Sequence, residues 1–413
     1  MPISALFRTA LAFRLSPLFV LAMFGGFQGE PGWSQQYALA ATSHAEAAIW
    51  VLAPLAAMCA AWEGYRLRRS EWLAQPRSRH LAVVVGWALV PVIGVAWAAF
   101  LSGIVLKVLP STPDLRVTGL GLLILLAWIT LGFGVGLNVH AVIALPTVLV
   151  AGYCWFAFPP AFTPFWMRHV TGDLHACCSI ETDLAPMVPI AVCLVAAGLS
   201  LGGFALVRSR TPPTRTAWWA VAPVPVIVSV ALAAVMVDNL GPAPAVRRDV
   251  AMSCHGSNPE VCVYPEREGG LSDLASAASA SYRTWARMGF DGPAELSEAR
   301  AAFRGATSLY ASTDRTQSQL TAAVVEAVVP RHFRRCDTAP AVARSASRQL
   351  AAWLALTAEV NRDAVRETSG RKLLELATVV SQRPDRRQRT WVARQLELFG
   401  TCQPDGSGDR DAR

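Results

Sequence analysis

Residues 168–178 concentrate side chains that can bind a metal ion. The candidates are His169, Asp173, His175, Cys177 and Cys178. Imidazole, carboxylate and thiolate groups are the ligands that zinc and copper take from proteins. Their spacing matches no established ligand pattern, however, so a disulfide-bearing or partner-contacting loop is the competing interpretation. His169, Asp173 and His175 are therefore kept as weak metal-ligand candidates, and no cofactor is assigned.

The sequence lacks two common motifs of hydrolytic enzymes. The sequence contains no HExxH zinc helix and no GxxxxGK[ST] phosphate-binding loop. His255 and Glu260 lie close together in a turn-rich stretch and are interpreted as turn residues. The sequence therefore predicts a protein that is not an enzyme. Any use of ATP would require a separate ATPase polypeptide.

A short basic segment, residues 62–72, is the best candidate for contact with a partner. Arg66, Arg68 and Arg69 follow one another on a predicted helix at the end of an apolar run. One hypothesis is that these arginines dock on a cytoplasmic partner, such as a separate ATPase subunit. The alternative is that they only hold this loop in the cytoplasm.

The composition indicates which elements must position these groups. Of the 413 residues, 53% are hydrophobic and 16% are charged, whereas a globular domain carries about 25% charge. Long uncharged runs continue to Val237, and from Arg247 the chain reads like a soluble protein. The net charge of +8 is not gathered on a basic helix face with interleaved aromatics, so we predict a lipid bilayer as partner and no nucleic acid.

Seven apolar segments are predicted to cross the membrane, because a crossing needs roughly 20 apolar residues. They are Leu15–Phe27, Ala45–Trp62, Leu81–Leu106, Val117–Leu137, Ala141–Phe158, Met187–Val207 and Ala217–Val237. The first is short and is read either as a retained span or as a cleaved signal peptide. The fold class is thus all-α: a polytopic bundle of about seven spans in residues 1–240, followed by a mostly helical soluble domain.

Polar and small residues refine this prediction. Ionisable residues fall only at the ends of the predicted spans, which argues against a proton- or sodium-coupled carrier. These residues are Glu46, Glu63, Lys107, His140 and Asp238. Glycines inside the spans are expected to permit close helix packing. They are Gly132, Gly134, Gly136, Gly198 and Gly202.

The distribution of basic residues orients the spans, because Lys and Arg favour short cytoplasmic loops. With the N-terminus inside, ten arginines lie on the cytoplasmic side, and Lys107, Arg116 and Arg168 lie outside. The sequence therefore predicts a multi-pass protein of the cell membrane whose C-terminal domain is extracellular.

Cysteine positions agree with an exterior C-terminal domain, residues 247–402. Extended segments flank the turn between Cys254 and Cys262, so a disulfide across this predicted hairpin is reasonable. Cys336 and Cys402 would then form a second pair that stabilises the domain by roughly 4 kcal/mol. Sequence alone does not fix this connectivity.

Helical periodicity dominates the remainder of the exterior domain. Leu271, Leu274, Ala278, Tyr282 and Trp285 share one predicted helix face. Further helices are predicted at Pro293–Phe303, Gln317–Val329, Ala341–Val360, Gly370–Val380 and Arg386–Phe399. Residues 403–413 are polar and are expected to be disordered.

The layout resembles uncharacterised actinobacterial membrane proteins that are loosely similar to ABC-2-type transporter permeases. The resemblance rests on the AAWEGYRLRR exit from the second predicted span, the CHGSNPEVCVYP segment that begins at Cys254, and the ending between Trp391 and Cys402. It implies a permease-like subunit that works with a separate ATPase. Permeases of that type have six spans with both termini inside, and this chain departs from them on both counts.

Two functions are therefore predicted. The first is a permease-like subunit of an ABC-type transport system, within a homo- or hetero-oligomer. The alternative is a membrane-anchored exterior binding or sensory protein without transport activity. The two differ in whether an ATP-binding protein accompanies the chain, and neither interpretation identifies a substrate.

Overall fold

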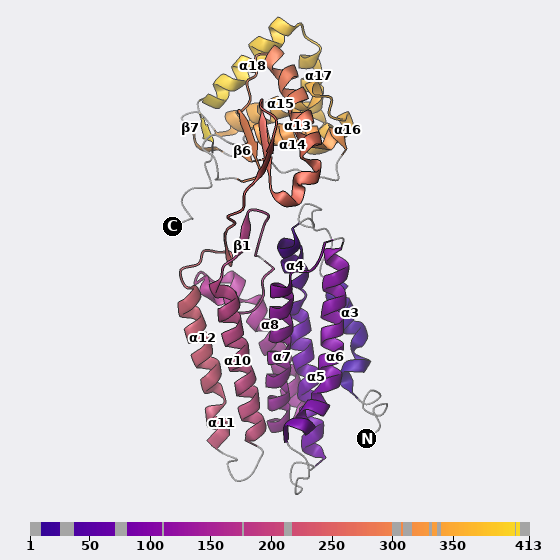
Figure 1. Ribbon diagram of the computed structural model, residues 1–413, viewed down its shortest axis with the longest axis vertical. Coiled ribbons are helices and arrows are strands. Elements are labelled where there is room, and N and C mark those ends of the chain that lie inside the picture. The colour runs from indigo at the N-terminus through magenta and orange to yellow at the C-terminus, as the bar shows by residue number, and fades with distance from the viewer. Residues whose placement is uncertain are drawn as a thin grey trace. The chain divides into compact units, whose positions relative to one another are not determined.

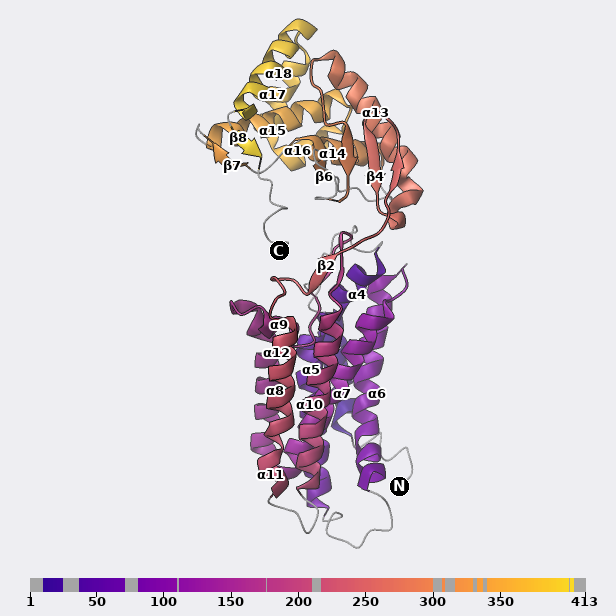
Figure 2. The same cartoon turned by 60° about the vertical axis from the view of Figure 1, so that its left-hand side comes forward.

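The computed structural model describes residues 10–24, 37–70, 81–109, 111–175, 177–209, 217–299, 307–308, 316–329, 333–336, 340–400 and 402–404. The chain divides into two compact units, Met1–Arg248 and Asp249–Arg413. They are called the membrane unit and the C-terminal unit below, and Figures 1 and 2 show the helices and strands of each. The break falls close to the change in composition near Arg247.

The membrane unit is built from long helices that run side by side in both views (Figures 1 and 2). Its elements are α2 (Leu11–Arg14), α3 (Ser16–Phe24), α4 (Ala38–Glu46), α5 (Ile49–Arg69), α6 (Leu81–Val108), α7 (Leu115–Asn138), α8 (Ala141–Ala157), α9 (Trp166–His169), β1 (Thr182–Leu184), α10 (Met187–Arg208), α11 (Ala217–Val221), α12 (Pro223–Val237) and β2 (Ala245–Arg247). β2 pairs with β1 in an antiparallel ladder, so residues 245–247 belong to this unit.

Five helices among the described residues are long and apolar enough to cross a membrane. They are Val83–Val108, Leu115–Asn138, Ala141–Ala161, Met187–Arg208 and Trp219–Val237. A sixth candidate is the pair α4 and α5, whose axes are bent by 48°. Large apolar side chains such as Val142, Ile227 and Val235 are exposed on these helices, which suits contact with lipid rather than water. The chain is therefore a membrane-spanning protein with five to six candidate spans.

The first predicted span, Leu15–Phe27, is not confirmed. In place of Leu15–Phe27, the structure has α2 and the nine-residue α3, which is about 14 Å long against a hydrocarbon core of about 30 Å. The segment nevertheless packs along α5 and α6. The backbone N–H of Leu11 donates to Glu63, and the Met23 side chain fills the space beside Gly103. Residues 25–27 lie outside the described part of the chain.

α7 is the helix on which the membrane unit is assembled, and glycines bring its neighbours close. A Cβ atom on Gly132 or Gly136 would overlap the backbone of Ala57 or Ala61 on α5. On another side of α7, a Cβ on Gly134 would meet the backbone of Gly203 on α10. These glycines have the packing role expected for small residues in lipid-embedded helices.

The C-terminal unit is mainly helical and carries short strands. Its elements are β3 (Ser253–His255), β4 (Glu260–Val263), α13 (Leu271–Arg287), β5 (Glu295–Ser297), β6 (Thr307–Ser308), α14 (Gln317–Val328), β7 (Phe333–Cys336), α15 (Pro340–Thr357), α16 (Arg362–Ser369), α17 (Arg371–Ser381), α18 (Asp385–Gly400) and β8 (Cys402–Pro404). α14, α17 and α18 lie within two residues of their predicted bounds, α15 ends three residues before its predicted end, and α16 was not predicted.

A small mixed sheet replaces one predicted helix. β3 and β4 form the antiparallel hairpin, and β5 and β6 extend it through parallel pairing in the order β3-β4-β5-β6. The prediction of a helix at Pro293–Phe303 is thus wrong for residues 295–297, because their backbone pairs with β4. α13 lies between the parallel strands β4 and β5 along the chain, where a parallel pair requires a crossover connection.

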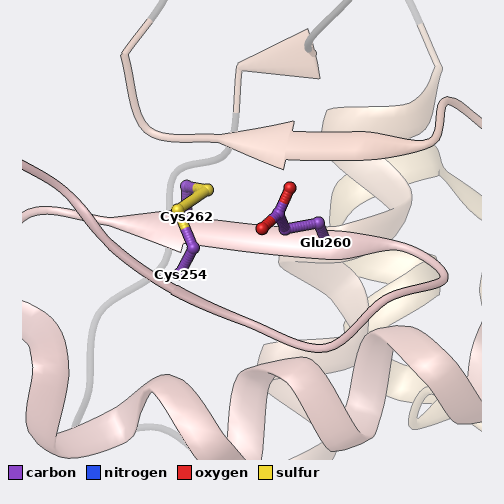
Figure 3. Close-up of side chains that lie close together, drawn as sticks. All are labelled: Cys254, Glu260 and Cys262. Carbon is purple, nitrogen blue, oxygen red and sulfur yellow. A yellow bond between two sulfur atoms is a disulfide. The ribbon is translucent and has the colours of Figure 1, made fainter.

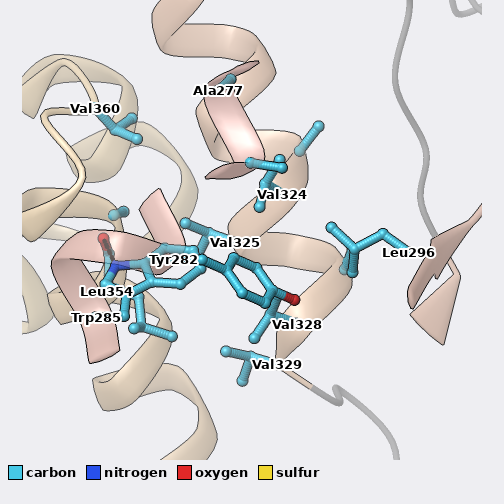
Figure 4. Close-up of a cluster of buried hydrophobic side chains, with 14 of the residues drawn as sticks. Ala277, Tyr282, Trp285, Leu296, Val324, Val325, Val328, Val329, Leu354 and Val360 are labelled. Atoms are coloured by element: carbon cyan, nitrogen blue, oxygen red, sulfur yellow. Dashed lines mark hydrogen bonds between the residues drawn. The ribbon is translucent and has the colours of Figure 1, made fainter. Parts of the chain in front are cut away.

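Large aromatic side chains fill the core of the C-terminal unit (Figure 4). The indole N–H of Trp285 donates to the carbonyl oxygen of Leu354 at 3.2 Å, and that of Trp353 donates to Oε1 of Gln388 at 3.1 Å. Both indoles are fully buried, so each N–H needs such an acceptor. The predicted face of α13, from Leu271 to Trp285, lies in this core.

A buried ion pair lies beside the sheet. The guanidinium of Arg267 binds the carboxylate of Glu298, and the side chains are 2% and 1% exposed. The same carboxylate accepts the backbone N–H of Tyr264 at 3.0 Å. Burial raises the pKa of Glu298, and the charge of Arg267 offsets part of that rise.

Both predicted cysteine pairs occupy opposing positions in antiparallel ladders. Cys254 faces Cys262 across the hairpin with the sulfur atoms at disulfide distance and the Cα atoms 4.1 Å apart. Cys336 faces Cys402 in the ladder of β7 and β8, where the backbone alone is described. Cys177 and Cys178, adjacent in sequence, also lie at disulfide distance. The predicted disordered tail from residue 405 lies outside the described residues.

Candidate functional site

Asp173 organises the 168–178 loop in the membrane unit. Its Oδ2 atom accepts the indole N–H of Trp50 at 2.5 Å and lies 2.6 Å from Nδ1 of His175. Its other oxygen accepts the backbone N–H of His175 at 3.1 Å. The Asp173 side chain is 4% exposed and that of His175 is 33% exposed, so the imidazole lies between the buried carboxylate and the surface.

His169 does not join the two other predicted metal ligands. Its Nε2 atom donates to the carbonyl oxygen of Gly241 at 2.9 Å. Burial lowers the pKa of His169, so the neutral imidazole is favoured. In the described parts of the chain, the ligand atoms of His169, Asp173 and His175 do not gather within 4.8 Å of one another. The loop thus brings two of the three candidates together, as a hydrogen-bonded pair.

Glu46 is the site residue that the sequence analysis missed. It was placed at a span end, yet it is fully buried where α4 meets α5. Its carboxyl group faces the charge of Asp173 and the backbone of Leu174 from the 168–178 loop. On the opposite side, a Cβ atom on Gly121 of α7 would lie 2.9 Å from its Oε1. The backbone of Leu174 stabilises the charged form of this carboxyl group, but no hydrogen bond of normal geometry reaches either oxygen among the described residues.

Glu46, Trp50, Asp173 and His175 are called the polar cluster below. A buried carboxyl without a partner is costly unless it is protonated or meets a cation. The only sequence signal for the burial of Glu46 is a glutamate flanked by alanines within the stretch Ala38–Ile49. Periodicity could not show that the 168–178 loop reaches it.

The three arginines predicted to dock on a partner have different surroundings. Arg66 pairs with Glu63 at 2.9 Å, and Arg68 donates to the carbonyl oxygen of Asn138 at 3.1 Å. Asn138 in turn donates to the carbonyl of Leu206 at 2.8 Å, which joins the ends of α7 and α10. Arg66 and Arg68 therefore make contacts within the unit, while Arg68 and Arg69 are both exposed.

Residues Gly198–Gly202 carry the letters of the GxSxG hydrolase elbow, although the sequence analysis predicted no such elbow and assigned these glycines to helix packing. That motif needs its serine on a sharp turn from a strand into a helix. Here all five residues lie inside α10. A Cβ on Gly198 would overlap Ser229 of α12, so this glycine serves helix packing and the segment is no elbow.

Cys254, Glu260 and Cys262 are the described side chains that come within 4.8 Å as a potential metal-ligand group (Figure 3). The two cysteines lie at disulfide distance from each other. A disulfide offers no thiolate, and thiolate is the form of cysteine that binds metal. Joined as a disulfide, the two cysteines would close the hairpin and would offer no thiolate to a metal ion.

The C-terminal unit contains a groove of about 600 Å³ between α14, α15, α16 and α17. Its lining residues are Ala322, Val325, Glu326, Val329, Arg344, Ser347, Arg348, Ala351, Ala355, Val360, Ala364, Val365, Thr368, Ser369 and Leu373. Pockets that bind small molecules measure about 300–1,000 Å³. The groove has the size and the mixed lining of a ligand site.

A second cavity of about 460 Å³ lies in the membrane unit between α6, α7 and α10. Its lining is apolar apart from Thr130, Ser200 and Arg208. Phe204 at its edge is 54% exposed on the surface that suits lipid. This cavity is typical of a lipid-facing indentation between helices.

The family match found for this chain lies within the C-terminal unit. Residues 261–402 match a family described as a domain of unknown function, DUF7224. No curated protein and no solved structure matches the chain. The matched segment begins in β4 and ends at the first residue of β8, so it contains every helix that lines the groove.

Proposed function

We propose that the chain is a membrane-anchored binding protein whose C-terminal unit takes up a ligand on the outer side of the cell membrane. The observation that carries this proposal is the groove of about 600 Å³ in that unit. The outer location rests on the arginine bias of the loops.

Packing in the membrane unit supports a role as an anchor. Where α7 meets α5 and α10, the contacts at Gly132, Gly134 and Gly136 leave no space for even one added methyl group. A substrate path through these two interfaces would require the helices to separate. Arg66 and Arg68 are also engaged inside the unit, which weakens the argument for docking on an ATPase.

A permease-like subunit is the second candidate, and the polar cluster favours it. Ionisable groups buried in membrane bundles are frequently part of ion or substrate pathways. This candidate requires a separate ATPase, and Arg69 would be its exposed contact.

Purification of the full-length chain from membranes in mild detergent separates the two candidates. For a binding protein, mass spectrometry should find no ATP-binding protein in stoichiometric amount. A reporter fused after Arg413 should be active only outside the cell. A stoichiometric ATPase that is lost in the Arg69→Glu variant would instead establish the permease-like subunit.

A further inference from the structure

We infer that the groove of the C-terminal unit binds a single-chain amphiphile with one anionic head group, a carboxylate or a phosphate. The inference rests on the proposed binding function. It deepens that function by naming the ligand class from the distribution of charge along the groove.

The polar end of the groove is formed by the first half of α15. Arg344 and Arg348 are four residues apart and so share one helix face, with Ser347 on the same face. All three line the groove, and Glu326 of α14 adds one negative charge. Two arginines against one glutamate give the lining a net positive formal charge, which favours an anion over a cation. Arginine is suited to both head groups, because its guanidinium matches carboxylate and phosphate oxygens.

The rest of the described lining is mostly apolar, with hydroxyl groups only at Thr368 and Ser369. Ala351 and Ala355 continue the same face of α15 for two more turns. Val360 and Val365 are 5% and 3% exposed and belong to this apolar lining. From Arg344 to Ala355 the helix rises about 16 Å, so an extended chain can lie along it with its head group at the arginines.

Two local contacts fix the walls of the groove. The backbone N–H of Asn361 donates to Oγ of Ser318 at 2.8 Å, which attaches the start of α16 to the start of α14. Oδ1 of Asn361 caps α16 by accepting the backbone N–H of Asp363 at 2.8 Å. The described lining holds no aromatic ring on which a base or sugar would stack, so an aliphatic chain is the better occupant.

The test is isothermal titration of the full-length protein in nanodiscs of zwitterionic lipid. The probes are decanoate, decyl phosphate, decanol and decyltrimethylammonium. At least one anionic probe should bind saturably, and decanol and the cation should bind at least tenfold more weakly. The tighter of the two anions assigns the head group, and equal affinity assigns the shared anionic chemistry.

Matched variants locate the site. Arg344→Gln with Arg348→Gln should weaken the anionic probes at least tenfold, and Ala351→Trp should abolish their binding by filling the groove. The controls Arg386→Gln with Arg394→Gln, and Ala393→Trp, change exposed residues of α18 and should leave binding unchanged. Folding of each variant is checked by circular dichroism, and the conservative pair Arg344→Lys with Arg348→Lys should retain part of the affinity.

Two results would overturn the inference in different ways. If decanol binds as tightly as the anions, or if Ala351→Trp abolishes the binding of a ligand of another class, the anionic amphiphile is wrong and the binding function stands. If no probe binds, Ala351→Trp abolishes no binding and a stoichiometric ATPase co-purifies, the proposed function fails together with the inference.

Discussion

Helices in the membrane unit meet through glycines, whereas helices in the C-terminal unit meet through large side chains such as Trp285 and Trp353. The hydrophobic effect explains the difference. In lipid an apolar side chain gains little by leaving the solvent, so close backbone contact stabilises the bundle. In water the burial of large apolar surfaces drives folding. The candidate ligand groove lies in the C-terminal unit, while the membrane unit holds a smaller and mostly apolar cavity.

Buried carboxyl groups show the same contrast. Glu298 in the C-terminal unit is paired with Arg267 and also accepts a backbone N–H. Glu46 in the membrane unit accepts no hydrogen bond of normal geometry from the described residues and faces a second acid, Asp173. Paired acids hold a structure together, while an unpaired one is a functional candidate. Four substitutions test how the two units are held together.

The largest effect is expected from Arg267→Met. It leaves the Glu298 carboxylate buried without its partner, so the C-terminal unit should lose about 3–5 kcal/mol of stability. Hydrogen exchange of the β4 and α13 amides in the full-length chain measures that loss. Arg366→Met is the control, because its pair with Asp363 is exposed and contributes less than about 1 kcal/mol. Equal losses in both variants would refute the structural role of the buried pair.

Gly136→Val tests the packing of the membrane unit. The added side chain would overlap the backbone of Ala61, so we expect a loss of about 1–3 kcal/mol and a lower yield of monodisperse protein. Gly119→Val on the same helix is the control, since a Cβ there meets no atom within 4 Å. Thermal stability in detergent compares them. A tolerated Gly136→Val would mean that α5 and α7 are not in close contact.

Asp173→Ala tests whether the polar cluster holds the 168–178 loop. The indole N–H of Trp50 would lose its acceptor inside the protein, at a cost of about 1–3 kcal/mol. Faster hydrogen exchange at Thr171–Leu174 is the expected result. Asp183→Ala, which removes the more exposed pair with Arg116, should leave that exchange unchanged. Unaltered exchange in Asp173→Ala would show that the loop is held by other contacts.

His169 should give the smallest effect, as a pH dependence. Burial lowers its pKa below the ordinary 6.5, so below that pH the unfolded state binds a proton that the folded state does not. Stability should therefore fall as the pH decreases from about 6.5. The thermal stability of the wild type and of His169→Gln, measured from pH 7.5 to 5, should differ in slope. Identical slopes would mean that folding does not change the pKa of His169.

The sequence predicted the long helices well and the sites poorly. Leu81–Leu106 and Val117–Leu137 differ from α6 and α7 by no more than two residues at either end, because a lipid-crossing helix needs a long apolar run. Strands of two or three residues carry no periodic signal, so β5 depends on its pairing with β4, and β6 depends on its pairing with β5. The predicted helix at Pro293–Phe303 failed for that reason.

The candidate sites depend on contacts between segments far apart in the chain. Glu46 was visible as a single charge, but its burial results from α7 and from the loop that carries Asp173. The helices that carry Arg344 and Val325 were predicted, yet their groove also requires α16, which was not predicted. Local patterns therefore identified the elements but not what they enclose.

The start of the family match at residue 261 has a practical consequence for expressing the domain. β3 precedes that boundary, and it supplies both the antiparallel neighbour of β4 and the sulfur atom opposite Cys262. A fragment cut at the boundary would expose a bare strand edge and a lone thiol, two features that promote self-association. A fragment that begins at Asp249 keeps the hairpin whole and should remain monomeric where the shorter one aggregates.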